Sequence, residues 1–385
     1  MTDAPFSAGP SGLIRLFDRL SQSYTSWRNA KISNPKFQEW ASRFPLTRRT
    51  SRRSAEEVYD LVSGFVYSQT LLACVEFDLL NAAQREAIDP VSLAHAKGLD
   101  ADRLGMLCQA GAALELLTRQ RDGRYGLGRL GAAVIGVPGL ELMIRHHRMF
   151  YRDLADPDAL MKDEVETQLS QYWPYVGGNK THDLAPDVAK TYSELMATSQ
   201  QLVATQTLRA VSLRGVSHLV DIGGGTGAFL TAVAAQYSAP SLTVFDLPSV
   251  AEEARRSLAQ AGLAERIQVA GGSFLDDPLP AGADAVSLIR VLYDHDDSTV
   301  RPLLKAVFEA LPKGGLLLIS EPMSGGAKPT KAGDAYFGFY TMAMTTGRPR
   351  SAARHAELLS EAGFSGIRHH ATDTAFVTNV LTAQK

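Results

Sequence analysis

A short glycine-rich turn behind an aspartate is the part of this chain best suited to hold a small ligand. It reads Asp221-Ile222-Gly223-Gly224-Gly225-Thr226-Gly227 and follows an apolar run, so we expect it where a buried strand becomes a helix. Glycines there let the backbone approach a ligand, and the helix N-terminus supplies N–H donors. Asp221, at the strand end, suits an ammonium group better than a phosphate. We expect Asp221, Gly223 and Gly225 to contact a cationic ligand, although the turn alone would also suit a dinucleotide.

A second acid, Asp246, lies 21 residues after Gly225 and ends the next predicted strand. A carboxylate there can accept hydrogen bonds from both hydroxyls of a ribose, and Leu247 follows it. Ser273 and Phe274 follow the third strand, where the edge and face of an adenine would lie. Together these residues predict S-adenosylmethionine as the cofactor and S-adenosylhomocysteine as its product. A helix cap before Pro248 and an ordinary turn at Ser273 are the alternatives.

Apolar runs that alternate with helical patterns predict the sheet that positions these residues. The runs are 217–222, 241–247, 267–271, 284–290 and 315–321. Such alternation implies an α/β domain with a mostly parallel, Rossmann-like sheet covered on both faces, which we place at residues 209–385. Residues 375–385 are expected to form a final strand at an antiparallel edge.

The preceding residues, 55–208, are expected to form a helical domain with a winged-helix unit. Between Pro90 and Val134 the pattern is a helix, a turn at Gly98-Leu99-Asp100, a second helix from Ala101 and a hairpin that turns at Asp122-Gly123. The second helix carries only Arg103 as a side chain able to read a base. Packing against protein is therefore favoured over DNA binding, and no nucleic-acid partner is expected.

Residues 1–54 form a third, basic and aromatic segment. Between Arg28 and Arg53 there are eight Lys or Arg residues and one acid, Glu39, interleaved with Trp27, Phe37, Trp40 and Phe44. Such a segment is either a solvated leader or an interfacial segment that touches anionic lipid headgroups.

Bulk properties indicate a cytoplasmic protein of at least two domains. A chain of 385 residues exceeds one ordinary core, and its formal net charge of −2 gives no global attraction to nucleic acid. Cys74 and Cys108 lie in apolar helical patterns, which indicates buried thiols in a reducing compartment. We find no apolar run of the roughly 18 to 20 residues that a membrane span requires, and no signal-peptide core. We therefore expect any membrane contact to be peripheral.

These motifs resemble the class I S-adenosylmethionine-dependent O-methyltransferases of small molecules that carry an N-terminal dimerising winged helix. The resemblance covers roughly residues 55–385, through "RVLYDHDD" (290–297), "LPKGGLLLISEPM" (311–323) and "GRPRSAARHAELLSEAGF" (347–364). Within that family, "MIRHHRMFYRDLADP" and "YFGFYTMAMTTGRPRSAARHAELL" most resemble the bacterial enzymes that act on acyclic hydroxycarotenoids of the hydroxyneurosporene or demethylspheroidene type. The resemblance implies a homodimer, an apolar carotenoid substrate and further cofactor contacts at Met196, Ser273 and Arg290.

One departure from the family concerns the general base. The family commonly has His-Asp-Trp where this chain has Tyr293-Asp294-His295, so the usual histidine is absent. We expect His295 to take the proton because imidazole titrates near neutral pH, with Tyr293 and Asp294 beside it and Glu321 as its orienter. The alternative is that His295 replaces only the packing role of the tryptophan.

The acceptor pocket is expected between two helical patterns. His146 and His147 lie in one, and Tyr336, Phe339, Tyr340 and Met344 lie in the other. Core packing and ordinary helix histidines are the alternatives. We expect no metal, because Asp294, Asp296 and Asp297 are explained as caps at a helix start and no histidine or cysteine spacing accompanies them.

Three other functions fit the sequence. A C-methyltransferase of tetrapyrrole synthesis would share the architecture, and a methyltransferase of phenols would too, although it would more readily keep the family histidine. The third is a winged-helix regulator that senses S-adenosylmethionine without turnover.

Overall fold

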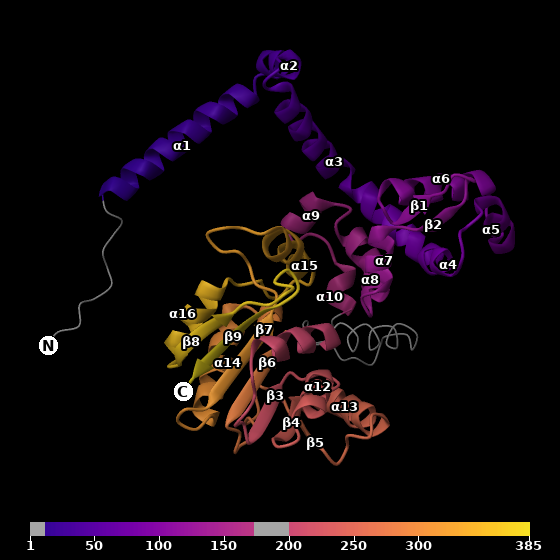
Figure 1. Ribbon diagram of the computed structural model, residues 1–385. Coiled ribbons are helices and arrows are strands. Elements are labelled where there is room, and N and C mark those ends of the chain that lie inside the picture. The colour runs from indigo at the N-terminus through magenta and orange to yellow at the C-terminus, as the bar shows by residue number, and fades with distance from the viewer. Residues whose placement is uncertain (1–11, 173–199) are drawn as a thin grey trace.

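A seven-stranded sheet forms the centre of the C-terminal half. The computed structural model describes residues 12–172 and 200–385 (Figure 1). The strands are β3 (His218–Ile222), β4 (Ser241–Asp246), β5 (Ile267–Gly271), β6 (Ala285–Ile289), β7 (Leu316–Glu321), β8 (Ser365–His370) and β9 (Asn379–Gln384). Their order is β5-β4-β3-β6-β7-β9-β8, with β3 to β7 parallel and β9 antiparallel to both neighbours. The five predicted parallel strands are confirmed.

The predicted position of the last strand at an edge is wrong. β9 lies between β7 and β8, so the edge is β8, a strand that the sequence analysis did not identify. The physical reason is the exposure of β8, because none of its six residues is fully buried. An exposed edge strand lacks the apolar run by which the central strands are recognised.

Helices cover both faces of the sheet, as the alternation predicted. The helix at residues 200–210, α12 (Ala228–Gln236) and α13 (Pro248–Gln260) pack on one face, and α14 (Asp297–Ala310) and α16 (Ala352–Ala362) pack on the other. Val203 and Leu208 belong to the core of the first face together with Leu219 of β3. The helix at 200–210 therefore packs with the sheet domain, although the sequence placed most of it in the preceding one.

The N-terminal half contains the expected winged-helix unit. It comprises α5 (Pro90–Lys97), α6 (Ala101–Ala113) and the hairpin of β1 (Leu117–Arg119) and β2 (Tyr125–Leu127). Asp89 and Asp100 cap the two helices with their side chains. Cys74 and Cys108 are fully buried and unbonded in the core of this unit, as predicted. The core also takes in α4 (Leu79–Arg85) and α7 (Arg129–Ile135).

A long helical arm precedes this unit. It runs through α1 (Gly12–Ile32) and α2 (Pro35–Arg43) into α3 (Arg48–Glu76), and Figure 1 shows α1 and α2 projecting away from the rest of the protein. Among the described residues α3 is long and apolar enough to cross a membrane by length and composition alone, with 17% of that window buried. The prediction that no apolar run is long enough to span a membrane is therefore wrong. The run from Val58 to Val75 contains a single charged residue, Asp60.

The two halves meet through a helical layer. α8 (Leu140–Asp153), α9 (Pro157–Met161) and α10 (Gln168–Tyr172) lie beside a π-helical turn, η3 (Lys331–Tyr336), and α15 (Phe337–Ala343). Phe150, Leu160 and Leu169 form a small core there with Tyr340 and Met344. This layer lies over the sheet edge at which the carboxyl ends of the parallel strands meet (Figure 1).

Candidate active site

The glycine turn lies where predicted, between β3 and α12. Gly223, Gly225 and Gly227 have φ angles of 67°, 56° and 82°, a left-handed backbone that favours glycine. A Cβ on Gly223 would lie 2.8 Å from Val291 Cγ2, whereas a Cβ on Gly225 would meet open space. The turn is thus packed on one side by Val291 and open at its tip, which leaves room for a ligand beside the backbone.

Asp221 presents a buried carboxylate oxygen at this turn. Its side chain is 1% exposed, and its Oδ1 accepts a hydrogen bond of 2.6 Å from Ser287 Oγ. Within the described parts of the chain Oδ2 has no hydrogen-bond partner. Burial, with a further contribution from Asp246, raises the pKa of Asp221 to about 7. A buried acid with one unused oxygen is suited to bind a cationic group, because such a partner would favour the charged form.

Asp246 lies beside the same turn. Its Oδ2 accepts from Gly225 N at 2.8 Å and its Oδ1 accepts from Leu247 N at 2.7 Å. Burial raises the pKa of Asp246 even though these two N–H groups favour the carboxylate. Each oxygen keeps a second lone pair for a ribose hydroxyl. The alternative role as a cap of α13 is not observed, since the N-cap residue is Leu247 and no side chain caps that helix.

Phe274 and His295 form the neighbouring aromatic pair. Their ring centroids lie 5.4 Å apart in an edge-to-face arrangement. Burial lowers the pKa of His295. Ser273 makes the alternative turn, since its Oγ lies 3.1 Å from Asp276 Oδ2 and its N donates to Asp277 Oδ2. The contact with Phe274 favours the packing role of His295 over its role as the base.

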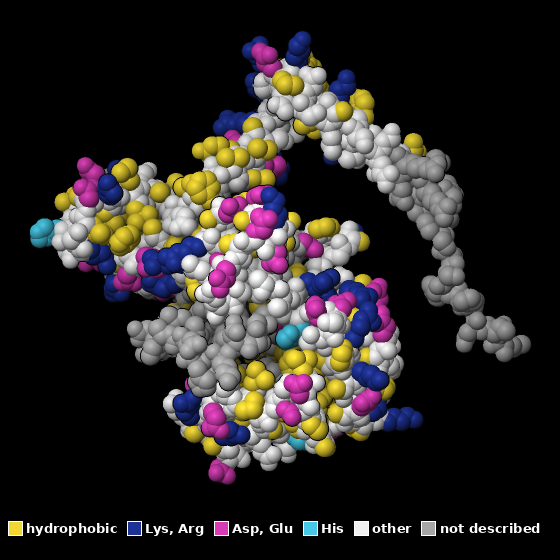
Figure 2. Space-filling view, turned by 180° about the vertical axis from the view of Figure 1, so that it is seen from behind, with side chains coloured by type: hydrophobic (Ala, Val, Ile, Leu, Met, Phe, Trp, Pro, Cys, Tyr) yellow, Lys and Arg dark blue, Asp and Glu magenta, His cyan; other side chains and the backbone are white. Residues whose placement is uncertain are grey.

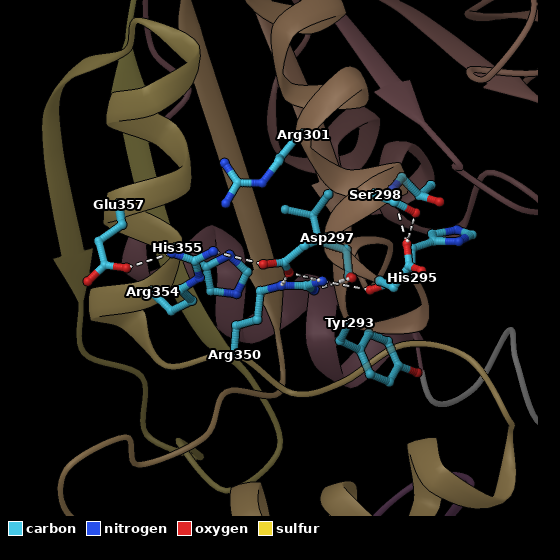
Figure 3. A network of polar contacts seen from close by, with 12 residues as sticks. Tyr293, His295, Asp297, Ser298, Arg301, Arg350, Arg354, His355 and Glu357 are labelled. Atoms are coloured by element: carbon cyan, nitrogen blue, oxygen red, sulfur yellow. Dashed lines mark hydrogen bonds and ion pairs between the residues drawn. The ribbon is translucent and has the colours of Figure 1, made fainter. Parts of the chain in front are cut away.

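Arg350, which the sequence analysis did not identify, fixes the loop that carries the catalytic candidates. Its side chain is 1% exposed; Nη1 donates to Leu292 O at 2.7 Å and Nη2 to His295 O at 2.8 Å. Nε donates to Asp297 Oδ1 at 2.8 Å, and Arg354 holds the other oxygen of Asp297 (Figure 3). These guanidinium groups, Arg354 first, lower the pKa of Asp297 to about 2.

The segment that carries Arg350 also binds the two backbone carbonyls between Leu292 and His295. Arg348 N donates to Tyr293 O at 2.9 Å, and Thr346 Oγ1 donates to Asp294 O at 3.0 Å. Gly347 has a φ of 78°, and a Cβ there would lie 2.2 Å from Tyr293 O. Residues 346–350 thus bind all four successive carbonyls of residues 292–295, which requires glycine at 347.

Glu321 does not contact His295 as expected. Its Oε2 accepts from Tyr293 N at 3.1 Å, and its Oε1 lies 3.0 Å from His355 Nε2. Glu321 and His355 are both completely buried. The predicted partner of Glu321 was His295, whereas its side-chain partner in the structure is a histidine of α16, 34 residues further along the chain.

Arg290 and Tyr293 form a second, partly buried polar pair. Arg290 Nη2 donates to Tyr293 Oη at 3.1 Å, and Arg290 has a φ of 58°, unusual for a residue other than glycine. Figure 3 shows the Tyr293 ring pointing away from the ion pairs of Arg350. Asp294 is also buried, and burial, followed by Glu321, raises its pKa to about 8. The charge of Arg290 therefore lies beside the Tyr293 hydroxyl.

Four of the predicted acceptor residues meet across the two halves. His146 Nε2 lies 2.8 Å from Tyr340 Oη, and His147 Nε2 lies 2.7 Å from Tyr336 Oη. Met344 is fully buried in the same small core. Phe339 does not join them, because it points outward and is 37% exposed. Met196 lies outside the described residues.

The acids beside the loop act as caps and ion-pair partners. Asp296 is the N-cap of α14 and accepts from Thr299 N at 3.1 Å. Over residues 12–172 and 200–385 no group of three His, Cys, Asp or Glu side chains is placed to hold a metal ion.

Two family comparisons agree with this architecture. Residues 59–135 match the O-methyltransferase dimerisation domain, and residues 155–365 match the O-methyltransferase domain. The chain has the fold of human N-acetylserotonin methyltransferase solved with S-adenosylmethionine, with a TM-score of 0.71 at 23% identity, over 86% of this chain and 97% of the other.

Two bacterial relatives have higher sequence identity to this chain. The chain is 50% identical to demethylspheroidene O-methyltransferase of Cereibacter sphaeroides over 380 residues, which cover 98% of this chain and 97% of that protein. It is 49% identical to the protein of the same name from Rhodobacter capsulatus, over 89% of this chain and 85% of that one. The chain therefore belongs to the S-adenosylmethionine-dependent O-methyltransferases.

Proposed function

We propose that this enzyme transfers a methyl group from S-adenosylmethionine to the hydroxyl of an acyclic hydroxycarotenoid of the demethylspheroidene type. The observation that carries the acceptor class is 50% identity over 98% of the chain to a protein of that name. Partly exposed side chains beside the small core between α8 and α15 support it, because a polyene requires apolar side chains along its length; they are Met149, Leu154, Val165 and Tyr336.

The residues present fit the cofactor. Asp221 offers an unused buried carboxylate oxygen for the ammonium group, and Asp246 offers acceptors for the ribose. Phe274 and His295 supply aromatic surface for the adenine. The bound sulfonium supplies an electrophilic methyl carbon. This chain then has to hold the acceptor oxygen in line with that carbon, and alignment of this kind can lower a barrier by about 7–11 kcal/mol.

Incubation of the purified enzyme with methyl-labelled S-adenosylmethionine and three separate acceptors tests the acceptor class. The acceptors are an acyclic tertiary hydroxycarotenoid, a simple phenol and a tetrapyrrole. We expect label in the carotenoid alone. Preferential labelling of the phenol or the tetrapyrrole would replace our proposal by one of those activities.

We further propose that the enzyme is a homodimer that buries the apolar face of α3. Val58, Leu61, Val62 and Phe65 on α3 are 59–79% exposed, and the dimerisation-domain match begins at residue 59. Figure 2 shows these hydrophobic side chains along the helix. Light scattering should give twice the chain mass, and Leu61→Glu with Phe65→Glu should give monomers. A monomeric parent protein would exclude this assembly.

We also propose that α2 and its flanking residues contact the membrane in which such an acceptor dissolves. We propose no nucleic-acid partner. Trp40 and Phe44 stack at 4.9 Å and are 50% and 38% exposed on a segment with eight cations and one acid between Arg28 and Arg53. Figure 2 shows dark blue side chains around this end of the arm. Each cation near an anionic surface contributes about 1 kcal/mol.

Sedimentation with lipid vesicles tests this contact. Phosphatidylglycerol vesicles should retain the enzyme and phosphatidylcholine vesicles should not. Lys36→Glu with Arg43→Glu should abolish retention, whereas the matched charge change Arg255→Glu with Arg256→Glu on α13 should preserve it. Equal retention of the two double variants would exclude α2 as the contact.

A further inference from the structure

The acceptor proton needs a destination that the usual family base does not provide here. The position of that base is Tyr293, whose hydroxyl accepts a hydrogen bond from Arg290 at 3.1 Å. A phenol group held beside a guanidinium is a poor proton acceptor, and His295 is packed against Phe274. A neutral imidazole close to Tyr293 would meet the requirement.

We infer that His147 accepts this proton through the hydroxyl of Tyr336. The inference rests on the proposed transfer to a hydroxyl group and adds the residues that remove its proton. His147 Nε2 and Tyr336 Oη lie 2.7 Å apart, one on α8 and the other at the end of η3, so the pair joins the two halves of the protein.

Ring contacts connect this pair to the catalytic loop. Tyr336 lies edge-to-face with Phe337 at 4.9 Å, and Phe337 lies edge-to-face with Tyr293 at 6.3 Å. Burial raises the pKa of Tyr336, and the charge of Arg290 partly offsets that rise. The Tyr336 ring therefore belongs to the aromatic cluster that includes Tyr293, beside which the acceptor oxygen has to be held.

The neighbouring pair, His146 and Tyr340, has a different environment. Both residues are buried, with 6% and 4% exposure, whereas His147 and Tyr336 are partly exposed. Burial first, then His147 and Arg290, lowers the pKa of His146 to about 4. The more enclosed pair is the structural one, and the partly exposed pair is placed to meet an acceptor.

The proton transfer balances without any further reactant. The acceptor oxygen forms a bond to the methyl carbon, and the carbon–sulfur bond breaks with its electron pair going to sulfur. The acceptor proton passes to Tyr336 Oη as the Tyr336 proton passes to His147 Nε2. The products are an ether, a neutral thioether and an imidazolium, which loses its proton to solvent on product release. Burial lowers the pKa of His147, which keeps the imidazole neutral and ready at neutral pH.

Tyr336→Phe and His147→Asn test the relay. Tyr125→Phe is the matched control, because its hydroxyl also donates to a side chain, Gln109 Oε1 at 2.8 Å, but lies in the winged-helix unit. A positioned acid–base group contributes about 10²- to 10⁴-fold to rate, so each of the first two changes should lower kcat at least about 100-fold. Tyr125→Phe should lower it less than about 10-fold. Calorimetric binding of S-adenosylhomocysteine should stay unchanged in all three, which shows that the fold and cofactor site are intact.

Two further measurements separate the relay from a packing effect. Nitrogen NMR of labelled histidine should show His147 Nε2 as an unprotonated acceptor, and its shift should change in Tyr336→Phe. Adding Tyr293→His to Tyr336→Phe should raise kcat at least about 10-fold, because it restores the base of the family. If the parent enzyme methylates the carotenoid while Tyr336→Phe and His147→Asn keep full kcat, the relay is wrong and the proposed function stands. If the parent enzyme methylates no hydroxyl, the proposed function fails first.

Discussion

Replacing Arg350 by methionine should destabilise the protein and detach the loop at residues 292–295. The Arg350 side chain is 1% exposed and makes three charged hydrogen bonds of 2.7–2.8 Å. A methionine would remove the guanidinium that donates to His295 O. Leu292 O would keep only its hydrogen bond from His295 N, at 3.2 Å. A buried polar group left unsatisfied costs about 1–3 kcal/mol, whereas Asp297 keeps Arg354 as a partner. We expect a loss of about 1.5–3 kcal/mol in the free energy of unfolding.

Urea unfolding followed by circular dichroism measures this loss, and Arg354→Met is the matched control. Arg354 contacts the same carboxylate but is 34% exposed, so its removal should cost about 1 kcal/mol or less. Arg350→Lys should fall between the two because it keeps a charge but not the planar fork. At urea concentrations where Arg350→Met is folded, its kcat should fall by more than its affinity for S-adenosylhomocysteine. A loss below about 1 kcal/mol for Arg350→Met, or a loss equal to that of Arg354→Met, would refute this account of the loop.

Four further outcomes follow from the site. Asp221→Asn should abolish calorimetric binding of S-adenosylhomocysteine, and Ser287→Ala should weaken it less, since the carboxylate remains; equal losses would contradict the role of the charge. Because burial raises the pKa of Asp221 to about 7, ligand binding in the parent enzyme should strengthen as the pH rises through 7 and should release a proton, which calorimetry in two buffers detects. Since the arginine partners lower the pKa of Asp297 to about 2, the stability that its carboxylate contributes should be present above about pH 4 and lost as the pH falls towards 2, and Asp297→Asn should flatten that part of the stability curve. His295→Phe should keep at least about a third of kcat, because the ring packs on Phe274, and a loss of 100-fold would restore His295 as the base.

The cofactor half of the site could be predicted from the sequence because its signals are local. β3 is an apolar run that ends in Asp221, and the glycine turn follows within six residues. Asp246 then falls at the end of the adjacent parallel strand, which brings it beside the same turn. Strand identity, turn and carboxylates are all encoded within one β-α-β unit.

The acceptor half could be predicted only as a set of residues. His147 and Tyr336 are 189 positions apart, and their pairing depends on the packing of α8 beside α15. The same holds for Glu321 and His355, and for Arg350 with the carbonyls of residues 292–295. Contacts of this kind have no periodicity or motif in the sequence, since they follow from how distant elements pack.

The order of the last two strands in the sheet could not be predicted from the sequence either. The pattern of β9 is apolar, but nothing local determines that it inserts between β7 and β8. The exposed sequence Ser365–His370 lacks the alternation of a half-buried strand, so the true edge went unrecognised.

Proton and carbon NMR of the carotenoid product, after reaction with S-adenosylmethionine carrying a ¹³C-labelled methyl group, tests the central claim most directly. Our account predicts one labelled methoxy signal, coupled to the carbon that bore the hydroxyl, and no reaction with Asp221→Asn. A label on carbon, or a labelled product formed equally well by Asp221→Asn, would contradict it.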